Sequence, residues 1–134
     1  RDKLAGISLL DAYTIAGGKR FIGNVTVKTD FLAPNTLVGF ENHSGLTYLE
    51  GDTVPLGIVS VGNGNNGKDG YEGARYKNVF GTYLHGSLLP KNPHFADFLI
   101  TLALEKRYGE KFVLSKLDDD IEVQTHNSLV GKAY

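Results

Sequence analysis

The chain has 134 residues, of which 41% are hydrophobic and 22% are charged, so it is long and apolar enough to bury the core of one domain. Its 14 lysines and arginines nearly balance its 15 aspartates and glutamates. This balance argues against a nucleic-acid partner or an anionic membrane surface. Cysteine is absent, which excludes disulfides and thiolate metal sites within the chain.

No apolar run approaches the roughly 18 residues that cross a bilayer, and the sequence does not open on a signal peptide. We therefore expect a cytoplasmic protein without membrane insertion. Composition and pattern do not change along the chain in a way that divides it, so residues 1–134 are expected to form part of one domain.

The first half of the sequence predicts short strands separated by turns. Residues 7–13 form an apolar run that ends at the turn-prone Gly17-Gly18, and residues 21–29 alternate with a period of two. Further strands are predicted over residues 37–40, 46–49 and 54–61, with a tight connection at residues 42–45 between the first two.

A polar, glycine-rich segment follows at residues 62–70 and precedes two predicted strands at residues 71–76 and 78–84. A phosphate-binding P-loop needs serine or threonine after its Gly-Lys pair. Here Asp69 follows Gly67-Lys68, and its carboxylate would repel phosphate. We therefore interpret the segment as an exposed loop between strands.

The clearest predicted helix begins near residue 93. Asn92 is suited to cap it, Pro93 fits its first position, and Gly109 is a natural stop. The tail over residues 110–134 has two open interpretations, a short helix that starts at Asp118-Asp119-Asp120 or a solvated arm that docks on a partner.

The four histidines differ in their functional promise. His85 follows a predicted strand and precedes a glycine, which suits either a catalytic base or a turn histidine bonded to a nearby carbonyl. His43 is a weaker candidate, and His94 and His126 are expected to be solvated. No histidines or carboxylates show the spacing of a metal site, so we expect neither a metal nor a cofactor.

Several motifs together point to a known family. The sequence resembles the cobyric-acid-synthase-like class I glutamine amidotransferases, and within them the glutaminase subunits of lipid II isoglutaminyl synthases. The similarity extends from about Leu4 to Leu104. It rests on these runs: Gly39-Phe40-Glu41-Asn42-His43, Gly64-Asn65-Asn66, Asp69-Gly70-Tyr71-Glu72-Gly73, Gly81-Thr82-Tyr83-Leu84-His85-Gly86 and Leu88-Leu89-Pro90-Lys91-Asn92-Pro93.

The resemblance implies a fold and two site residues. The fold class is α/β, with this chain as the β-rich C-terminal portion of a flavodoxin-like three-layer amidotransferase domain. His85 matches the catalytic histidine that activates a cysteine thiol for attack on L-glutamine. Arg20 matches a position that holds the glutamine, where a guanidinium grips a carboxylate with two hydrogen bonds; the alternative is a surface arginine at a strand start.

Two departures from the family pattern affect these expectations. The nucleophilic cysteine is not in this chain, so we expect the chain alone to be inactive. Many class I amidotransferases place a glutamate two residues after the histidine, where this sequence has Ser87. The carboxylate that orients His85 is then expected from Glu41 or from a partner subunit.

Three functions remain open from the sequence. The resemblance favours a glutaminase subunit that passes ammonia to a Mur-ligase-like synthetase partner, which amidates the stem-peptide glutamate of lipid II with ATP. A cobyric acid or cobyrinate amidase domain would perform the same half-reaction for a corrinoid acceptor. A β-rich interaction module with a purely structural His85 is the non-catalytic alternative.

Overall fold

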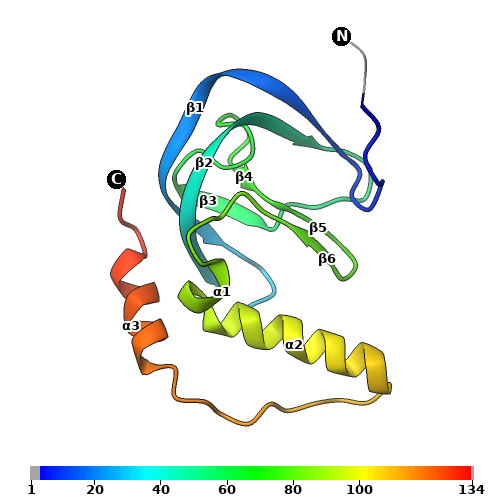
Figure 1. Ribbon diagram of the computed structural model, residues 1–134, viewed down its shortest axis with the longest axis vertical. Helices are drawn as coiled ribbons and strands as arrows, with labels where there is room; N and C mark the ends of the chain where they lie inside the picture. The colour runs from blue at the N-terminus through cyan, green and yellow to red at the C-terminus, as the bar shows by residue number, and fades with distance from the viewer. Residues whose placement is uncertain (1–3, 134) are drawn as a thin grey trace.

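The computed structural model describes residues 4–133 and shows a body of strands with helices packed against one end (Figure 1). Within these residues the elements, in chain order, are β1 (Ala12–Lys28), β2 (Thr36–Leu49), β3 (Gly57–Val61), β4 (Tyr71–Glu72), β5 (Ala74–Tyr76), β6 (Val79–Gly81), α1 (Leu88–Lys91), α2 (Pro93–Tyr108) and α3 (Asp120–Leu129). This mixed, strand-rich architecture agrees with the α/β class predicted for part of an amidotransferase domain.

Two long strands organise the sheet. β1 and β2 pair antiparallel along most of their length, and β3 and β4 extend the sheet in the order β2-β1-β3-β4. β5 and β6 form a separate antiparallel hairpin. In Figure 1 the curved β1 and β2 arch over the upper part of the molecule, with α2 running across its lower part.

The predicted turns at Gly17-Gly18 and at residues 42–45 are wrong. β1 runs through both glycines with a register shift between Ala16 and Phe21, and β2 is continuous through residues 42–45. A Cβ on Gly17 would lie 2.4 Å from the main-chain oxygen of Ser44. This glycine therefore permits close approach of two strands at a bulge, a role that glycine composition does not distinguish from a turn.

The two predicted strands over residues 71–76 and 78–84 are also shorter than expected. The first is divided at Gly73, whose φ is 66°. The second ends at Gly81. A Cβ on Gly73 would lie 2.5 Å from the Gly81 oxygen, so this position requires glycine for both its conformation and its space.

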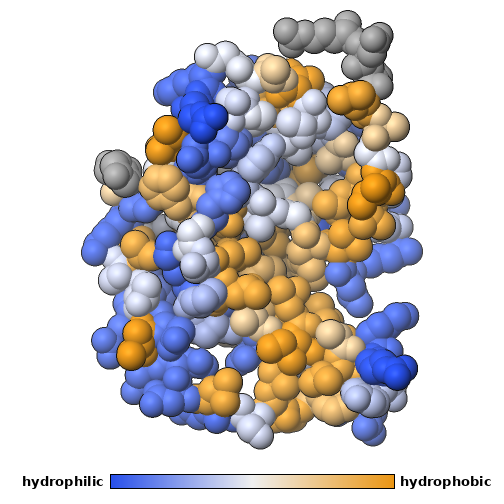
Figure 2. Space-filling view, viewed as in Figure 1, coloured by the Kyte–Doolittle hydropathy of each residue, from blue (hydrophilic) through white to orange (hydrophobic). Residues whose placement is uncertain are grey.

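The predicted helix is confirmed as α2, which begins at Pro93 and ends before Gly109, a left-handed residue with φ 73°. Its Phe95 is 2% exposed and joins the apolar core formed by the inner residues of the sheet. The core consists of Val25, Val27, Leu37, Leu56, Leu84 and Phe95. Figure 2 shows apolar side chains gathered over the region where α2 and the β5–β6 hairpin lie in Figure 1.

The tail forms α3, and one histidine prediction fails there. His126 was expected to be solvated, but it is 3% exposed. Its Nδ1 donates to the Lys91 oxygen at 2.9 Å, and its Nε2 accepts from the Thr36 hydroxyl at 2.9 Å. His94 is half-buried beside it and donates to the Thr36 oxygen at 2.8 Å. The two bonds of His126 dock α3 against β2 and α1, and the bond of His94 ties α2 to β2; the sequence pattern does not reveal these contacts.

Within residues 4–133, none of the helices combines the length and apolar character needed to cross a bilayer.

Candidate functional site

The main chain of His85 is clamped to β2. Its N–H donates to the Phe40 oxygen at 2.8 Å, and its oxygen accepts from the Phe40 N–H at 3.1 Å, which makes an isolated antiparallel bridge. Gly86 and Ser87 follow in left-handed conformations, with φ 74° and 63°. Two successive left-handed residues turn the chain sharply into α1, so His85 stands at the apex of a bend.

The sheet register and one hydrogen bond place the two predicted site residues on one face. In an antiparallel pair, directly opposed residues share a face, and successive residues alternate between faces. Phe40 is opposed by Asn24 on one side and by His85 on the other. Asn42, two residues along from Phe40, accepts from Arg20 Nη1 at 2.8 Å. His85 and Arg20 therefore project from the same exposed, outer face.

Arg20 lies within the register shift of β1 between Ala16 and Phe21. It is exposed, and Asn42 Oδ1 accepts from only one of its guanidinium nitrogens. No carboxylate among the described residues forms an ion pair with it. Its remaining N–H groups are thus free to bind a carboxylate.

The ring of His85 is exposed and has no hydrogen-bond partner within residues 4–133. Neither ring nitrogen of His85 is hydrogen-bonded to another of these residues. Both nitrogens are therefore available for proton transfer or for a hydrogen bond.

Glu41, one of the two expected sources of that carboxylate, faces away from His85. It follows Phe40 on β2, so its side chain points to the opposite, inner face, where it is 1% exposed. Its oxygens accept from the Asn63 and Gly64 N–H groups, each at 3.0 Å, and from the Asn63 amide. The ionisable group that it approaches is His43, at 3.9 Å.

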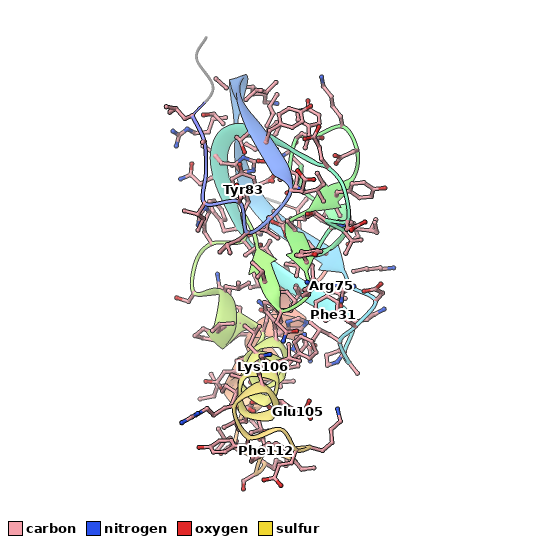
Figure 3. All side chains as sticks on the ribbon, turned by 90° about the vertical axis from the view of Figure 1, so that its right-hand side faces the viewer. Phe31, Arg75, Tyr83, Glu105, Lys106 and Phe112 are labelled. Atoms are coloured by element: carbon pink, nitrogen blue, oxygen red, sulfur yellow. The ribbon has the colours of Figure 1, made fainter. Side chains whose placement is uncertain are left out.

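His43 lies beneath the segment that leads into His85. It is 8% exposed and stacks on Tyr83, with ring centroids 3.6 Å apart and planes 5° apart. Its Nδ1 donates to the Gly45 oxygen at 2.9 Å, while its Nε2 is buried without a hydrogen bond. The ring of His43 is covered by protein and contacts the ring of Tyr83, two residues before His85. Tyr83 is labelled in Figure 3, in the strand body and well above α2.

The segment at residues 62–70 is the predicted loop between strands, here β3 and β4, but only part of it is exposed: Gly62 and residues 67–69 are exposed, whereas residues 64–66 are buried. Asn65 and Asn66 are 1% and 2% exposed. The Asn65 side chain bonds both the oxygen and the N–H of Gly73, at 2.8 and 2.7 Å, and the Asn66 side chain donates to the Thr47 oxygen at 2.9 Å. The two side-chain amides thus bond main-chain groups of Gly73 and Thr47, and they hold the loop against the neighbouring strands.

Glu72 is a buried carboxyl group whose role the sequence did not predict. It is fully buried, at 0% exposure, and accepts from the Tyr83 N–H at 2.7 Å and from the Thr82 hydroxyl at 2.9 Å. Burial raises its pKa from 4.5 to about 7, partly opposed by these two hydrogen bonds, and the charge of Glu41 adds a smaller upward contribution. The motif Asp69-Gly70-Tyr71-Glu72-Gly73 gave the signal, since an acidic residue between strand residues is unusual.

Among residues 4–133 there is no group of three or more histidines, aspartates or glutamates arranged to hold a metal ion. The outer face carries an imidazole at His85 and a guanidinium at Arg20, both of them exposed.

Comparison with known proteins identifies the family of the chain. Residues 1–93 match the model of the CobB/CobQ-like glutamine amidotransferase domain. The chain is 41% identical over 131 residues to the lipid II isoglutaminyl synthase (glutamine-hydrolyzing) subunit GatD of Staphylococcus aureus, covering 98% of this chain and 52% of that protein. It is 42% identical over 118 residues to the subunit of the same name from Streptococcus pneumoniae, covering 87% and 45%.

A more distant relative is a probable cobyric acid synthase of Methanothermobacter thermautotrophicus, 33% identical over 133 residues, with 92% of this chain and 25% of that protein covered. The chain spans about half the length of the first two relatives. The family match includes both His85 and Arg20. The chain belongs to the family of CobB/CobQ-like glutamine amidotransferases.

Proposed function

We propose that this chain forms the histidine-bearing part of a glutaminase that releases ammonia from L-glutamine. The observation that carries the proposal is the shared outer face of His85 and Arg20, with the His85 main chain clamped to Phe40 and its ring open. Arg20 binds the α-carboxylate of glutamine, and His85 works on the carboxamide at the other end of the substrate.

The reaction proceeds through a thioester on a cysteine from a segment of the protein outside these 134 residues. His85 takes the proton of the thiol, and the thiolate attacks the carboxamide carbon. His85 then gives the proton to the leaving nitrogen, so ammonia departs as the thioester forms. Water hydrolyses the thioester and regenerates the thiol, with glutamate as the second product. On this proposal the 134-residue chain alone has no activity.

For the acceptor, we propose the stem-peptide glutamate of lipid II, amidated with ATP by a Mur-ligase-like synthetase subunit that forms a heterodimer with the glutaminase. The names of two relatives that are 41% and 42% identical support this acceptor. The partner subunit would also supply the carboxylate that orients His85, because Glu41 lies on the opposite face and is bonded to Asn63 and Gly64. The cell compartment would be the cytoplasm, where ATP is available.

A second acceptor is favoured by one specific observation. The probable cobyric acid synthase is 33% identical over nearly the same span. The proposed half-reaction is the same for both acceptors, so the outer face with His85 and Arg20 does not choose between them.

The test uses the full-length protein with [amide-¹⁵N]glutamine, together with its synthetase partner and ATP. We expect ¹⁵N-ammonia to be released and ¹⁵N to enter the stem-peptide glutamate of lipid II. Incorporation into a corrinoid side chain instead would replace the acceptor and keep the glutaminase. If no ¹⁵N-ammonia were released and no ¹⁵N entered either acceptor, the proposed function would be rejected. For Arg20→Ala, we expect the KM for glutamine to rise at least tenfold while kcat changes less.

A further inference from the structure

The segment that carries His85 is held by side chains instead of by a strand ladder. Residues 82–84 lie after the end of β6 at Gly81 and before the bridge at His85. The Tyr83 N–H donates to Glu72 Oε1 at 2.7 Å, and the Leu84 N–H donates to Thr82 Oγ1 at 3.0 Å. The path of the chain into His85 therefore depends on what fixes Thr82 and Tyr83.

Glu72 provides that fixed point. Its carboxylate accepts from the Tyr83 N–H and also from the Thr82 hydroxyl, whose distances to the two carboxylate oxygens are 2.9 and 3.0 Å. One carboxylate thus bonds two consecutive residues of the segment, Thr82 and Tyr83. The Thr82 hydroxyl oxygen also accepts from the Leu84 N–H, so Leu84 is held through Thr82.

The support of Glu72 is itself rigid. Its main chain pairs with Gly57 in the sheet. The next residue, Gly73, is bonded on both its N–H and its oxygen by the buried amide of Asn65. Glu72 therefore connects a well-anchored point of the sheet to the segment that precedes His85.

A carboxyl group at this depth carries a desolvation cost, since burial raises its pKa to about 7. An apolar side chain would avoid that cost but would leave the Tyr83 N–H without its acceptor. The buried acid therefore contributes hydrogen-bond acceptors for the Tyr83 N–H and the Thr82 hydroxyl.

We propose that Glu72 is the positioning residue of His85. By holding Thr82 and Tyr83, it sets where the histidine ring stands on the outer face relative to the substrate. The inference rests on the proposed role of His85 and adds a residue that touches neither substrate nor nucleophile.

The experiment compares Glu72→Gln with Glu72→Ala in the full-length enzyme. Glutamine at this position retains an oxygen for the Tyr83 N–H and an N–H for the Thr82 hydroxyl, so its kcat is expected to stay within about threefold of the original. Alanine removes both contacts, and kcat is expected to fall about 10- to 100-fold, because misplacement of a catalytic group by about 1 Å has effects of this size. The KM for glutamine should stay within about twofold, since Arg20 lies on β1 and is not held by Glu72.

Two further variants separate positioning from loss of stability. Val27→Ala removes core volume in β1 and takes away none of the hydrogen bonds of Glu72, and its kcat at a temperature where it is folded should match the original. Thr82→Val replaces an exposed residue with one of the same shape, so it should fold normally. It should still lower kcat, whereas Thr82→Ser, which retains the hydroxyl, should not.

The imidazole resonances of His85 provide an independent readout in the same proteins. They should shift in Glu72→Ala and Thr82→Val and remain in place in Glu72→Gln and Val27→Ala. Unchanged kcat and unchanged His85 resonances in folded Glu72→Ala and Thr82→Val would overturn the inference and leave the glutaminase intact. An original enzyme that releases no ammonia from glutamine would overturn both.

Discussion

The rings of His43 and Tyr83 lie face to face, with centroids 3.6 Å apart and planes 5° apart. The Tyr83 hydroxyl also bonds the hydroxyl of Thr47 on β2 at 2.8 Å. The residue two positions before His85 is thus attached to β2 by a stacked ring at one side and by a hydrogen bond at its tip.

This attachment gives a graded prediction for two variants of Tyr83. Tyr83→Phe keeps the stacked ring and loses one hydrogen bond, so the free energy of unfolding should fall by about 1 kcal/mol. Tyr83→Ala loses the ring as well and should cost about 3 kcal/mol, as for other large aromatic deletions. Urea unfolding of both variants measures the difference. Equal losses would mean that the hydrogen bond, and not the stack, holds the segment.

Gly39 allows β2 to pass close to the residue before His85. A Cβ on Gly39 would lie 2.8 Å from Leu84 Cβ, and both residues are backed by the protein interior. Gly39→Ala should therefore lower the free energy of unfolding by about 1 to 3 kcal/mol and lower kcat for glutamine, because Leu84 must move. Thermal unfolding and steady-state kinetics measure the two effects.

Gly18→Ala is the matched control for this change. A Cβ on Gly18 meets no atom within 4 Å, and its backbone is not in the left-handed region. We expect no loss of stability in this variant. If Gly39→Ala were equally harmless, the close approach of Gly39 and Leu84 would not be a requirement of the fold.

The buried carboxyl of Glu72 should make stability depend on pH. Its pKa is about 7 in the folded protein, above the ordinary 4.5, so the folded state binds a proton more tightly than the unfolded state. The resulting stability is fully present below pH 4.5 and is lost as pH rises through 7. Glu72→Gln does not titrate. Between pH 5 and 8 the original protein should therefore lose about 2 to 3 kcal/mol relative to this variant.

Urea unfolding of both proteins at several pH values measures this difference, and the paired comparison removes the contributions of other groups. One of those is His94, whose pKa is lowered chiefly by burial from its ordinary 6.5. It acts in the opposite direction, since its contribution is present above pH 6.5 and is lost as pH falls. A difference between the two proteins that stays constant from pH 5 to 8 would contradict the assignment to Glu72.

The docking of α3 should depend on His126. His126→Ala removes both ring hydrogen bonds, to the Lys91 oxygen and to the Thr36 hydroxyl, and leaves both groups without their partner. Amide hydrogen exchange in residues 120–129 should then accelerate at least tenfold, while exchange in β1 and β2 changes little. The exposed neighbour Asn127 provides the control, and Asn127→Ala should leave exchange unchanged. Equal acceleration in both variants would show that His126 does not dock the helix.

The sequence predicted α2 well because Asn92, Pro93 and Gly109 are local signals for the ends of a helix. Even there the Asn92 side chain does not cap the helix. It bonds the N–H and the oxygen of Val38, both at 2.8 Å, and so ties the helix start to β2. Predictions based on glycine failed where a glycine serves close contact between distant strands, as Gly17 and Ser44 show. Such contacts depend on the fold and have no local signature.

The site was predictable only in part, because some of its contacts also depend on the fold. His85 and Arg20 were found through motif resemblance. Their common face follows from the bridge between His85 and Phe40, the register of β2, and the hydrogen bond from Arg20 to Asn42. Glu41 was a candidate partner for His85 because it is an acidic residue within a matching motif. Only the alternation of β2 shows that it points to the inner face. Glu72 likewise appears in a motif, but its contact with Thr82 and Tyr83 needs the folded chain.

The central claim is that His85 is the catalytic base. The most direct test is the rate of ammonia release from saturating glutamine by full-length His85→Ala, with Tyr83→Phe measured beside it as a nearby change that keeps the base. We predict that His85→Ala lowers kcat at least about a thousandfold, as expected when a base that activates a nucleophile is removed, while its unfolding temperature stays close to the original. A folded His85→Ala enzyme that releases ammonia at the original rate would contradict the account.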